Sequence, residues 1–172
     1  MDQLRAELEA GPRNGTALCR RALRDWEAGA WSAPEAEVAD HAVADPRLPT
    51  LLLNPTLLIR GSVLGQPDGW FVGLGMGWEV DSRRFHADDD RFDATLARHD
   101  RFGRHGLQLL HVTPRRARRL GASYADVLAA AVAARRLAAQ PEPAGLLVRP
   151  FDPRALDVRD ISAPLLAWPY GQ

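Results

Sequence analysis

Residues 67–81 read PDGWFVGLGMGWEVD. A glycine-rich segment at 73–77 separates Asp68 from a run in which apolar and acidic residues alternate. That alternation has the period of two that a strand imposes on its side chains, so Glu79 and Asp81 share one face. A hairpin across the glycines brings Asp68 and Glu79 onto neighbouring strands, where side chains lie within bonding reach. The stretch therefore predicts a β-hairpin that carries carboxylates.

Helices and strands alternate on both sides of this hairpin. Apolar spacing, capping residues and turn-forming pairs predict helices at 2–10, 16–28, 33–44, 88–105, 114–120 and 123–139. Branched apolar runs predict short strands within 50–64 and at 107–112, in addition to the strand at 78–81. Prolines after Gln140 exclude long regular elements, so an extended tail is expected there. This order predicts an α/β fold with a mixed central sheet flanked by helices.

Two of the longer helices have an expected inward side. In the helix at 88–105 this side carries Phe92, Leu96, His99 and Phe102. In the helix at 123–139 it carries Val127, Leu128, Ala131 and Val132. Both assignments follow from the helical period.

Length and composition indicate one globular domain with extensions. The 172 residues are 46% hydrophobic and 26% charged, which is ordinary for a folded domain. We expect an N-terminal helical extension over 1–28, the α/β domain over 29–140, and a proline-rich tail over 141–172 that packs on the domain. No apolar run approaches the roughly 20 residues that span a bilayer, and no secretory signal opens the chain. A cytoplasmic protein with no membrane segment is expected, and the single Cys19 has no predicted role.

The charges balance, with 22 basic and 22 acidic residues, so the field of the whole molecule does not attract a polyanion. DNA binding would depend on local patches. Every basic residue is an arginine, because the sequence contains no lysine. Arg98, Arg101, Arg115 and Arg116 could contact phosphates. A solvated arginine surface is an equally good explanation of the same residues.

Asp68 and Glu79 have the chemistry of a magnesium site. Mg²⁺ binds oxygen ligands and keeps several waters. A metal-bound water becomes a nucleophile for a phosphodiester, and the ion neutralises charge that develops on the phosphate.

These acids, together with other motifs, resemble a known class of nucleases. Pro67-Asp68 followed by Glu79-Val80-Asp81 is similar to the PD-(D/E)XK signature. Motifs at 29–35, 78–82, 85–86, 98–101 and 111–114 resemble, in order and spacing, a bacterial family similar to very-short-patch repair endonucleases. Members of that family often follow a winged-helix segment of the AbiEi antitoxin type. The resemblance covers roughly residues 11–138 and implies a restriction-endonuclease-like fold and Mg²⁺-dependent cleavage of DNA.

The resemblance implies roles for particular residues. Asp68 and Glu79 match the metal-binding acids, and Glu35 matches a helix glutamate that joins the site. His86 matches a histidine beside the scissile phosphate, and its ordinary pKa near neutrality suits a general acid or base. Asp81 stands where most members of the superfamily have a lysine, and this chain has no lysine to replace it. His86 is therefore the candidate for that missing function.

Each of these residues also has a structural explanation. Glu35 closes a capping box that Ser32 opens, and Asp68 lies in a Pro-Asp-Gly turn. Glu79 is costly if buried without a partner, although an edge strand would leave it solvated. Asp81 could equally pair with Arg83 or Arg84 at the surface or contact the metal as a catalytic residue.

The histidines other than His86 are predicted to have structural roles. His99 is expected to be a satisfied core residue, His105 a helix end and His111 a strand position. Their spacing is not that of a zinc site.

Three functions follow from the sequence, in order of preference. The first is a metal-dependent DNA endonuclease. The second is a catalytically inactive regulator of the antitoxin type that binds DNA or a protein partner through the same fold. The third is an interaction module that uses the C-terminal tail. The sequence has no recognisable winged helix before residue 11, so either the domain acts alone or a toxin or winged-helix partner supplies DNA targeting.

Overall fold

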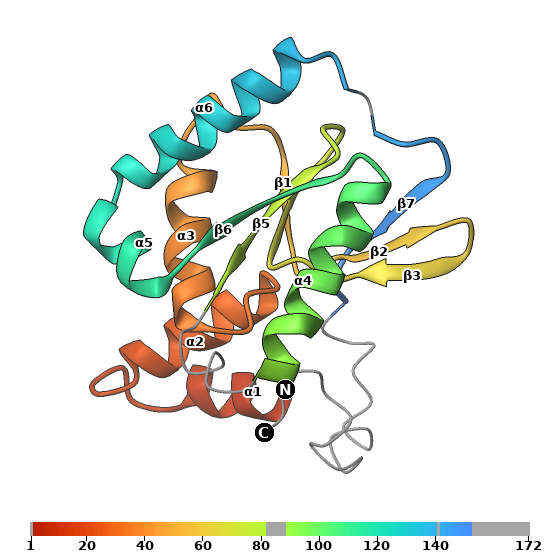
Figure 1. Ribbon diagram of the computed structural model, residues 1–172. Coiled ribbons are helices and arrows are strands. Elements are labelled where there is room, and N and C mark those ends of the chain that lie inside the picture. Colours follow the sequence, from red (N-terminus) through yellow and green to blue (C-terminus); the bar gives the residue numbers. More distant parts are fainter. Residues whose placement is uncertain (1, 82–88, 141, 153–172) are drawn as a thin grey trace.

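The structure is a computed structural model that describes residues 2–81, 89–140 and 142–152 (Figure 1). Within these ranges the helices are α1 (Asp2–Ala10), α2 (Ala17–Glu27), α3 (Ala33–Val43), α4 (Asp89–Arg104), α5 (Pro114–Leu120) and α6 (Ser123–Leu137). The strands are β1 (Leu51–Leu53), β2 (Thr56–Ile59), β3 (Ser62–Gly65), β4 (Gly69–Phe71), β5 (Met76–Val80), β6 (Gln108–Val112) and β7 (Leu146–Arg149). The predicted mixed α/β class is confirmed, and the predicted elements have nearly the expected bounds.

The main sheet has four strands in the order β1-β4-β5-β6. β1 pairs antiparallel with β4, and β4 pairs antiparallel with β5. β5 and β6 are parallel, so the chain must cross over between them, and α4 forms that crossover. The sheet is therefore mixed, as the sequence predicts.

Glycine and tryptophan alternate across the β4–β5 hairpin. Gly69 pairs with Trp78, and Trp70 pairs with Gly77. A Cβ atom on Gly69 would lie 2.2 Å from the Trp78 ring, and one on Gly77 would lie 2.3 Å from the Gly69 carbonyl oxygen. Each glycine thus makes room for the indole ring opposite it, and both rings are fully buried. This packing explains glycines that are otherwise unfavourable inside strands.

A second sheet, absent from the sequence prediction, contains three strands in the order β3-β2-β7. The β2–β3 hairpin turns at Arg60 and Gly61, both of which have positive φ. β7 comes from the proline-rich tail and pairs antiparallel with β2. The part of the expected tail at 146–149 is therefore a strand, whereas residues 153–172 lie outside the described residues.

Helices cover both faces of the main sheet (Figure 1). One face packs on α3, α5 and α6 through a core that includes Val38, Trp78, Tyr124 and Leu128. The other face packs on α4, where Phe102 is buried in a second cluster with Trp70. Side chains alternate along β5, so Trp78 faces the first core and Glu79 faces α4.

Two inward assignments from the sequence are wrong. Leu96 is 45% exposed, and Val127 is 37% exposed. On α6 the buried positions instead include Arg135, whose guanidinium donates to the carbonyl oxygens of Leu74, Gly75 and Gly106. Its hydrogen bonds offset the cost of burying a charged side chain.

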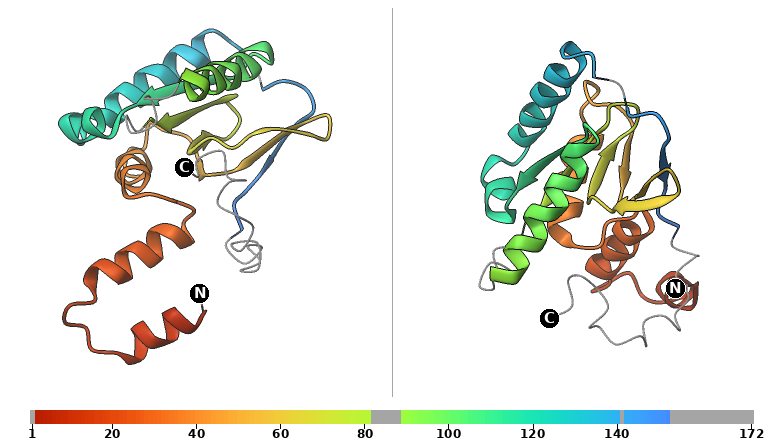
Figure 2. Two further views of the ribbon diagram at one scale, coloured as in Figure 1. Left: turned by 60° about the horizontal axis from the view of Figure 1, so that its bottom comes forward. Right: turned by 45° about the vertical axis from the view of Figure 1, so that its right-hand side comes forward.

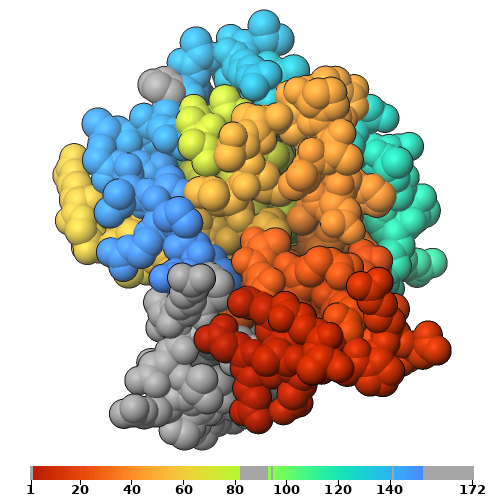
Figure 3. Space-filling model, turned by 180° about the vertical axis from the view of Figure 1, so that it is seen from behind, coloured from red at the N-terminus to blue at the C-terminus, as the bar shows by residue number. Residues whose placement is uncertain are grey.

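The N-terminal helices stand apart from the helices that cover the sheet, as the left view of Figure 2 shows. From behind, the segment that ends at Asp152 reaches α2 and the residues after it (Figure 3). Phe151 makes edge-to-face contacts there with Trp26 and Trp31, at ring-centroid distances of 6.0 and 5.7 Å. None of the helices in the described part of the chain is long and apolar enough to cross a membrane.

Candidate functional site

Glu79 is the buried carboxylate around which the candidate site is built. It lies in β5 on the face covered by α4 and is 2% exposed. Arg98 on α4 forms an ion pair with its Oε2 atom. The Oε1 atom is buried and has no hydrogen-bond partner among the described residues. Burial raises the pKa of Glu79, and the positive charge of Arg98 opposes that shift.

His111 lies directly beside Glu79 because the two residues pair across the parallel strands β5 and β6. Its Nδ1 atom is 3.9 Å from Glu79 Oε2 and 2.8 Å from Asp81 Oδ2. Asp81 follows β5, and its backbone N–H donates to the Val112 carbonyl oxygen. Burial tends to raise the pKa of Asp81, but the His111 hydrogen bond and nearby positive charge outweigh it, so that pKa is lowered.

His99 approaches the same place from α4. Its ring lies 3.9 Å, centroid to centroid, from the ring of His111. Its Nε2 atom is buried and has no hydrogen-bond partner among the described residues. Burial lowers the pKa of His99, and the charge on His111 lowers it further. The sequence predicted that His99 is a core residue whose ring nitrogens have hydrogen-bond partners, and this prediction is wrong for Nε2.

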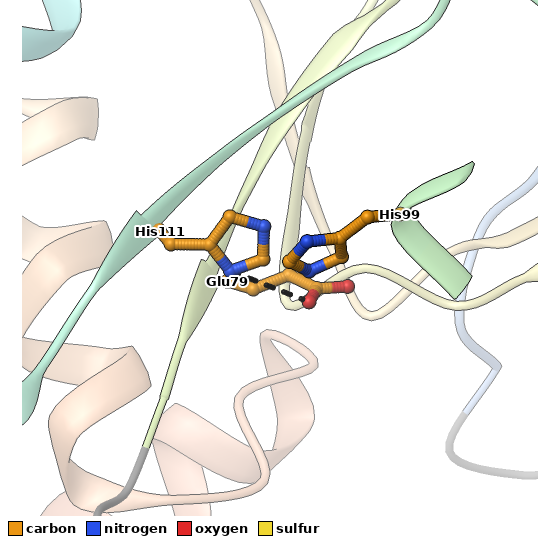
Figure 4. A group of neighbouring side chains, drawn as sticks. All are labelled: Glu79, His99 and His111. Atoms are coloured by element: carbon orange, nitrogen blue, oxygen red, sulfur yellow. Dashed lines mark ion pairs between the residues drawn. The ribbon is translucent and has the colours of Figure 1, made fainter. Parts of the chain in front are cut away.

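Glu79, His99 and His111 could together hold a metal ion. One ligand atom from each residue lies within 4.8 Å of the other two, and no other group of three or more potential ligands among the described residues does so. Figure 4 shows the two imidazole rings and the carboxylate converging from α4, β6 and β5. Two imidazoles and one carboxylate form a donor set that proteins use for Zn²⁺ and Fe²⁺.

Asp68 lies across the hairpin from Glu79. Asp68 directly precedes β4, next to the Gly69–Trp78 pair, and the Val80 N–H donates to Asp68 Oδ2 at 2.6 Å. Burial raises the pKa of Asp68 well above its usual range, and the negative charge of Glu35 adds to that shift. Asp68 is thus an acid in a negative, enclosed environment.

Glu35 makes local hydrogen bonds at the start of α3. Its Oε1 atom accepts from Ser32 Oγ at 2.6 Å, and its Oε2 atom accepts from the Trp31 N–H and Asn54 Nδ2, both at 2.9 Å. Ser32 in turn accepts from the Glu35 N–H at the N-cap. The capping interaction anticipated from the sequence is therefore present. Glu35 and Asp68 influence each other electrostatically, but neither belongs to the group of ligand atoms around Glu79.

Of the remaining predicted site residues, those that the structure describes lie outside the ligand group around Glu79. His86 lies outside the described residues, as do Arg83 and Arg84. Arg101, Arg115 and Arg116 are exposed. Arg115 and Arg116 lie in the first turn of α5, which starts directly after β6. This is the edge of the sheet at which the parallel strands β5 and β6 end, and ligands commonly bind at such edges.

Three residues at the site, Asn54, His99 and His111, were not predicted from the sequence to belong to it. Asn54 links Glu35 to the carbonyl oxygen of Gly29, and it has the positive φ of 45° that asparagine tolerates. His99 and His111 were noted only as structural. The signal that could have found them is the position of His99 on the sheet-facing side of α4, over a strand that carries His111.

We found no significant match to this chain among protein-family models, curated proteins or solved structures. The fold and site define an α/β protein with a buried carboxylate–histidine cluster at the edge of a mixed sheet. The resemblance to PD-(D/E)XK nucleases stays a prediction.

Proposed function

We propose that this chain is a metal-dependent endonuclease that hydrolyses phosphodiester bonds in DNA. The observation that carries the proposal is the position of Asp68 across the β4–β5 hairpin from Glu79, with the Val80 N–H bonded to the Asp68 carboxylate. Two acids at one end of a hairpin, one just before β4 and one in β5, suit a divalent cation and a phosphate.

The order of elements supports a restriction-endonuclease-like arrangement. α3 is followed by strands that pair antiparallel as β1-β4-β5, then by α4, and then by β6 parallel to β5. The second sheet is an addition to this order, with β2 and β3 between β1 and β4 and with β7 after α6. Asp68 and Glu79 lie on either side of the β4–β5 hairpin, where the glycine-rich sequence between them predicts a pair of carboxylates.

The residues around the acids have distinct roles under this proposal. A divalent cation, which the resemblance implies to be Mg²⁺, would supply an activated water and neutralise charge on the phosphate. Asp68 and Glu79 would bind that ion. Arg98 holds Glu79 in place and adds positive charge beside the site. Asp81 orients the His111 ring beside Glu79 through the hydrogen bond between its carboxylate and the His111 Nδ1 atom.

The DNA backbone would extend from this edge of the sheet over α5. Arg115 and Arg116 are exposed there and can pair with phosphates. Such contacts position DNA without reading its sequence, and the affinity they contribute falls as salt concentration rises.

A second function is favoured by a specific observation. Arg98 already neutralises Glu79, and Glu35 is fully engaged in local hydrogen bonds. Both features suit an inactive domain of the antitoxin type, which would bind DNA or a toxin or winged-helix partner without cleaving it. The two functions share the fold and differ in whether phosphodiester bonds are broken.

A plasmid-nicking assay with a panel of divalent cations tests the proposal. We expect nicking by the natural chain and its loss in Asp68→Asn and Glu79→Gln. Glu37→Gln is the matched control, because Glu37 is a partly exposed acid on α3 paired only with Arg118 in the described contacts, and it should leave nicking unchanged.

Intact plasmid under every cation would contradict the endonuclease. Retardation of DNA in the absence of metal, weakened when Arg115 and Arg116 are changed to glutamine, would then support the regulator.

A further inference from the structure

We propose that Glu79, His99 and His111 bind a single transition-metal ion of the Mn²⁺-to-Zn²⁺ series in preference to Mg²⁺. The protein ligands would be two imidazole nitrogens and one carboxylate oxygen. The inference goes beyond the proposed function, because it assigns Glu79 to a mixed nitrogen and oxygen donor set in place of the Asp68–Glu79 pair. It rests on the proposed function only for what the ion is used for.

The geometry brings the three ligands to one point from three elements. Glu79 and His111 are register partners on β5 and β6, and His99 on α4 covers them (Figure 4). Their ligand atoms lie within 4.8 Å of one another. Donor atoms around a tetrahedral zinc ion are about 3.4 Å apart, given bonds of about 2.1 Å. Small rotations of the side chains would complete such a site.

Two atoms at this point lack the partners that buried polar atoms normally have. Glu79 Oε1 and His99 Nε2 are both buried without a hydrogen-bond partner among the described residues. Native proteins satisfy nearly all such atoms, and an ion is one of the accepted explanations for an exception. Glu79 is 2% exposed, so bulk water does not solvate its free oxygen.

Asp81 completes the arrangement as an outer partner. Its Oδ2 atom is 2.8 Å from Nδ1 of His111. The nitrogen that is 3.9 Å from Glu79 Oε2 is this same Nδ1 atom, so under the proposal Nε2 of His111 would be the ligand atom. A carboxylate bonded to the other nitrogen of a ligating histidine fixes the orientation of the ring. Asp81 is therefore a positioning residue for His111.

The donor set decides which ions fit. Mg²⁺ prefers oxygen ligands in octahedral geometry and loses its waters reluctantly. Imidazole nitrogen suits zinc, iron and their neighbours in the series. The oxygen-only set of Glu35, Asp68 and Glu79 does not come together at ligand distance, because Glu35 is held at the start of α3. The mixed nitrogen and oxygen set is the one that the described residues assemble.

Metal titrations of the full chain test this inference directly. After treatment with a chelator, isothermal titration calorimetry with ZnCl₂ should give one equivalent bound, at least about 100-fold tighter than MgCl₂. Co²⁺ should produce visible absorption bands of a nitrogen-ligated site. His99→Ala and His111→Ala should each lower Zn²⁺ affinity by more than the 10–100-fold typical of outer partners, and Asp81→Asn should lower it by about 10–100-fold.

His105→Ala is the matched control, because His105 lies just after α4 and outside the cluster. It should leave binding unchanged. Thermal unfolding with and without Zn²⁺ separates loss of the site from loss of the fold: a folded variant without the site keeps its metal-free Tm and loses the Zn²⁺-dependent increase.

The outcomes distinguish this inference from the proposed function. Zn²⁺ affinity equal to that for Mg²⁺, or binding unaffected by both histidine changes, would overturn the inference even if DNA is nicked. Tight binding that depends on both histidines supports the inference even if no DNA is cleaved.

Discussion

Arg98 neutralises the buried carboxylate of Glu79, and its own side chain is 20% exposed. Removal of one member of a buried ion pair leaves the other charge uncompensated, which costs about 3–5 kcal/mol. Partial exposure of Arg98 places this pair at the lower end of that range. Contact with α4 therefore both neutralises the buried charge of Glu79 and fixes the position of its side chain.

We predict that Arg98→Gln lowers the free energy of unfolding by about 3 kcal/mol in the absence of metal. Urea denaturation measures this change. The double variant Arg98→Gln with Glu79→Gln should recover much of the loss, because it removes both charges. Arg101→Gln, on the exposed side of the same helix, should change stability by less than about 0.5 kcal/mol. Equal effects of the two single changes would contradict the assigned ion pair.

The buried side chain of Tyr124 is expected to make the stability of the protein depend on pH. Burial raises its pKa to about 12 from a model-compound value of 10.0. The folded state therefore favours the neutral phenol, so stability is fully present below pH 10 and declines as pH rises from 10 toward 12. The expected decline is about 3 kcal/mol.

Absorbance of tyrosinate in a Tyr170→Phe variant measures that pKa, since the chain has two tyrosines. A midpoint near pH 10 in the folded protein would refute the prediction. Tyr124→Phe should remove this part of the pH dependence of unfolding.

The β4–β5 hairpin depends on close cross-strand packing between glycine and tryptophan. A methyl group on Gly69 would overlap the Trp78 ring, which is fully buried and has no room to move. Overpacking of a core costs about 1–3 kcal/mol. Any shift of this hairpin also moves Asp68 relative to Glu79.

We predict that Gly69→Ala destabilises the protein by about 1–3 kcal/mol, measured by thermal or urea unfolding. Gly103→Ala is the control. A Cβ atom there meets nothing within 4 Å, and alanine is the better helix former, so this change should be neutral or stabilising by up to about 1 kcal/mol. Unchanged stability of the Gly69→Ala variant would show that the hairpin can accommodate a methyl group at this position.

At the scale of individual helices and strands, the sequence predicted the elements well and the long-range pairing of the strands poorly. The periods of two and 3.6, the cap at Ser32 and the proline at the start of α5 depend on neighbouring residues, so helices such as α3 and α5 could be predicted. The pairing of β7 with β2 joins distant segments, and no local pattern encodes it. The same limit hid the site: the parallel register that sets His111 beside Glu79 is a property of the sheet.

Helical periodicity also identifies an apolar side without its exact limits. Leu96 and His99 were both assigned to the inward side of α4, yet Leu96 is exposed and His99 reaches the cluster. Hydrophobicity alone ranks leucine above histidine for burial. Here the position of each residue over the sheet decided the outcome, and that position becomes visible only once α4 is docked.

At the scale of the whole molecule, Phe151 connects the two ends of the described chain. It packs edge-to-face against Trp26 of α2 and Trp31 of the following loop. Such aromatic pairs contribute about 0.5–1.5 kcal/mol each beyond the area they bury. These contacts connect the N-terminal helices to the segment that follows β7.

We predict that Phe151→Ala lowers stability by about 1–3 kcal/mol and changes tryptophan fluorescence before global unfolding. Leu147→Ala in β7 is the control, because Leu147 is 55% exposed and should have little effect. Hydrogen exchange of α2 amides provides the decisive comparison. Unchanged protection in the Phe151 variant would mean that this ring does not hold α2.

The parallel pairing of β5 with β6 has a consequence for how the protein folds. Glu79, His99 and His111 come from successive parts of one β–α–β unit, so the cluster is complete only when α4 has closed over the sheet. A ligand that needs all three side chains would bind only when α4 is packed over the sheet. Its measured affinity would therefore include the free energy of packing α4. In a single-molecule pulling experiment, the force needed to separate β5 from β6 should then be higher with the ion bound than without it.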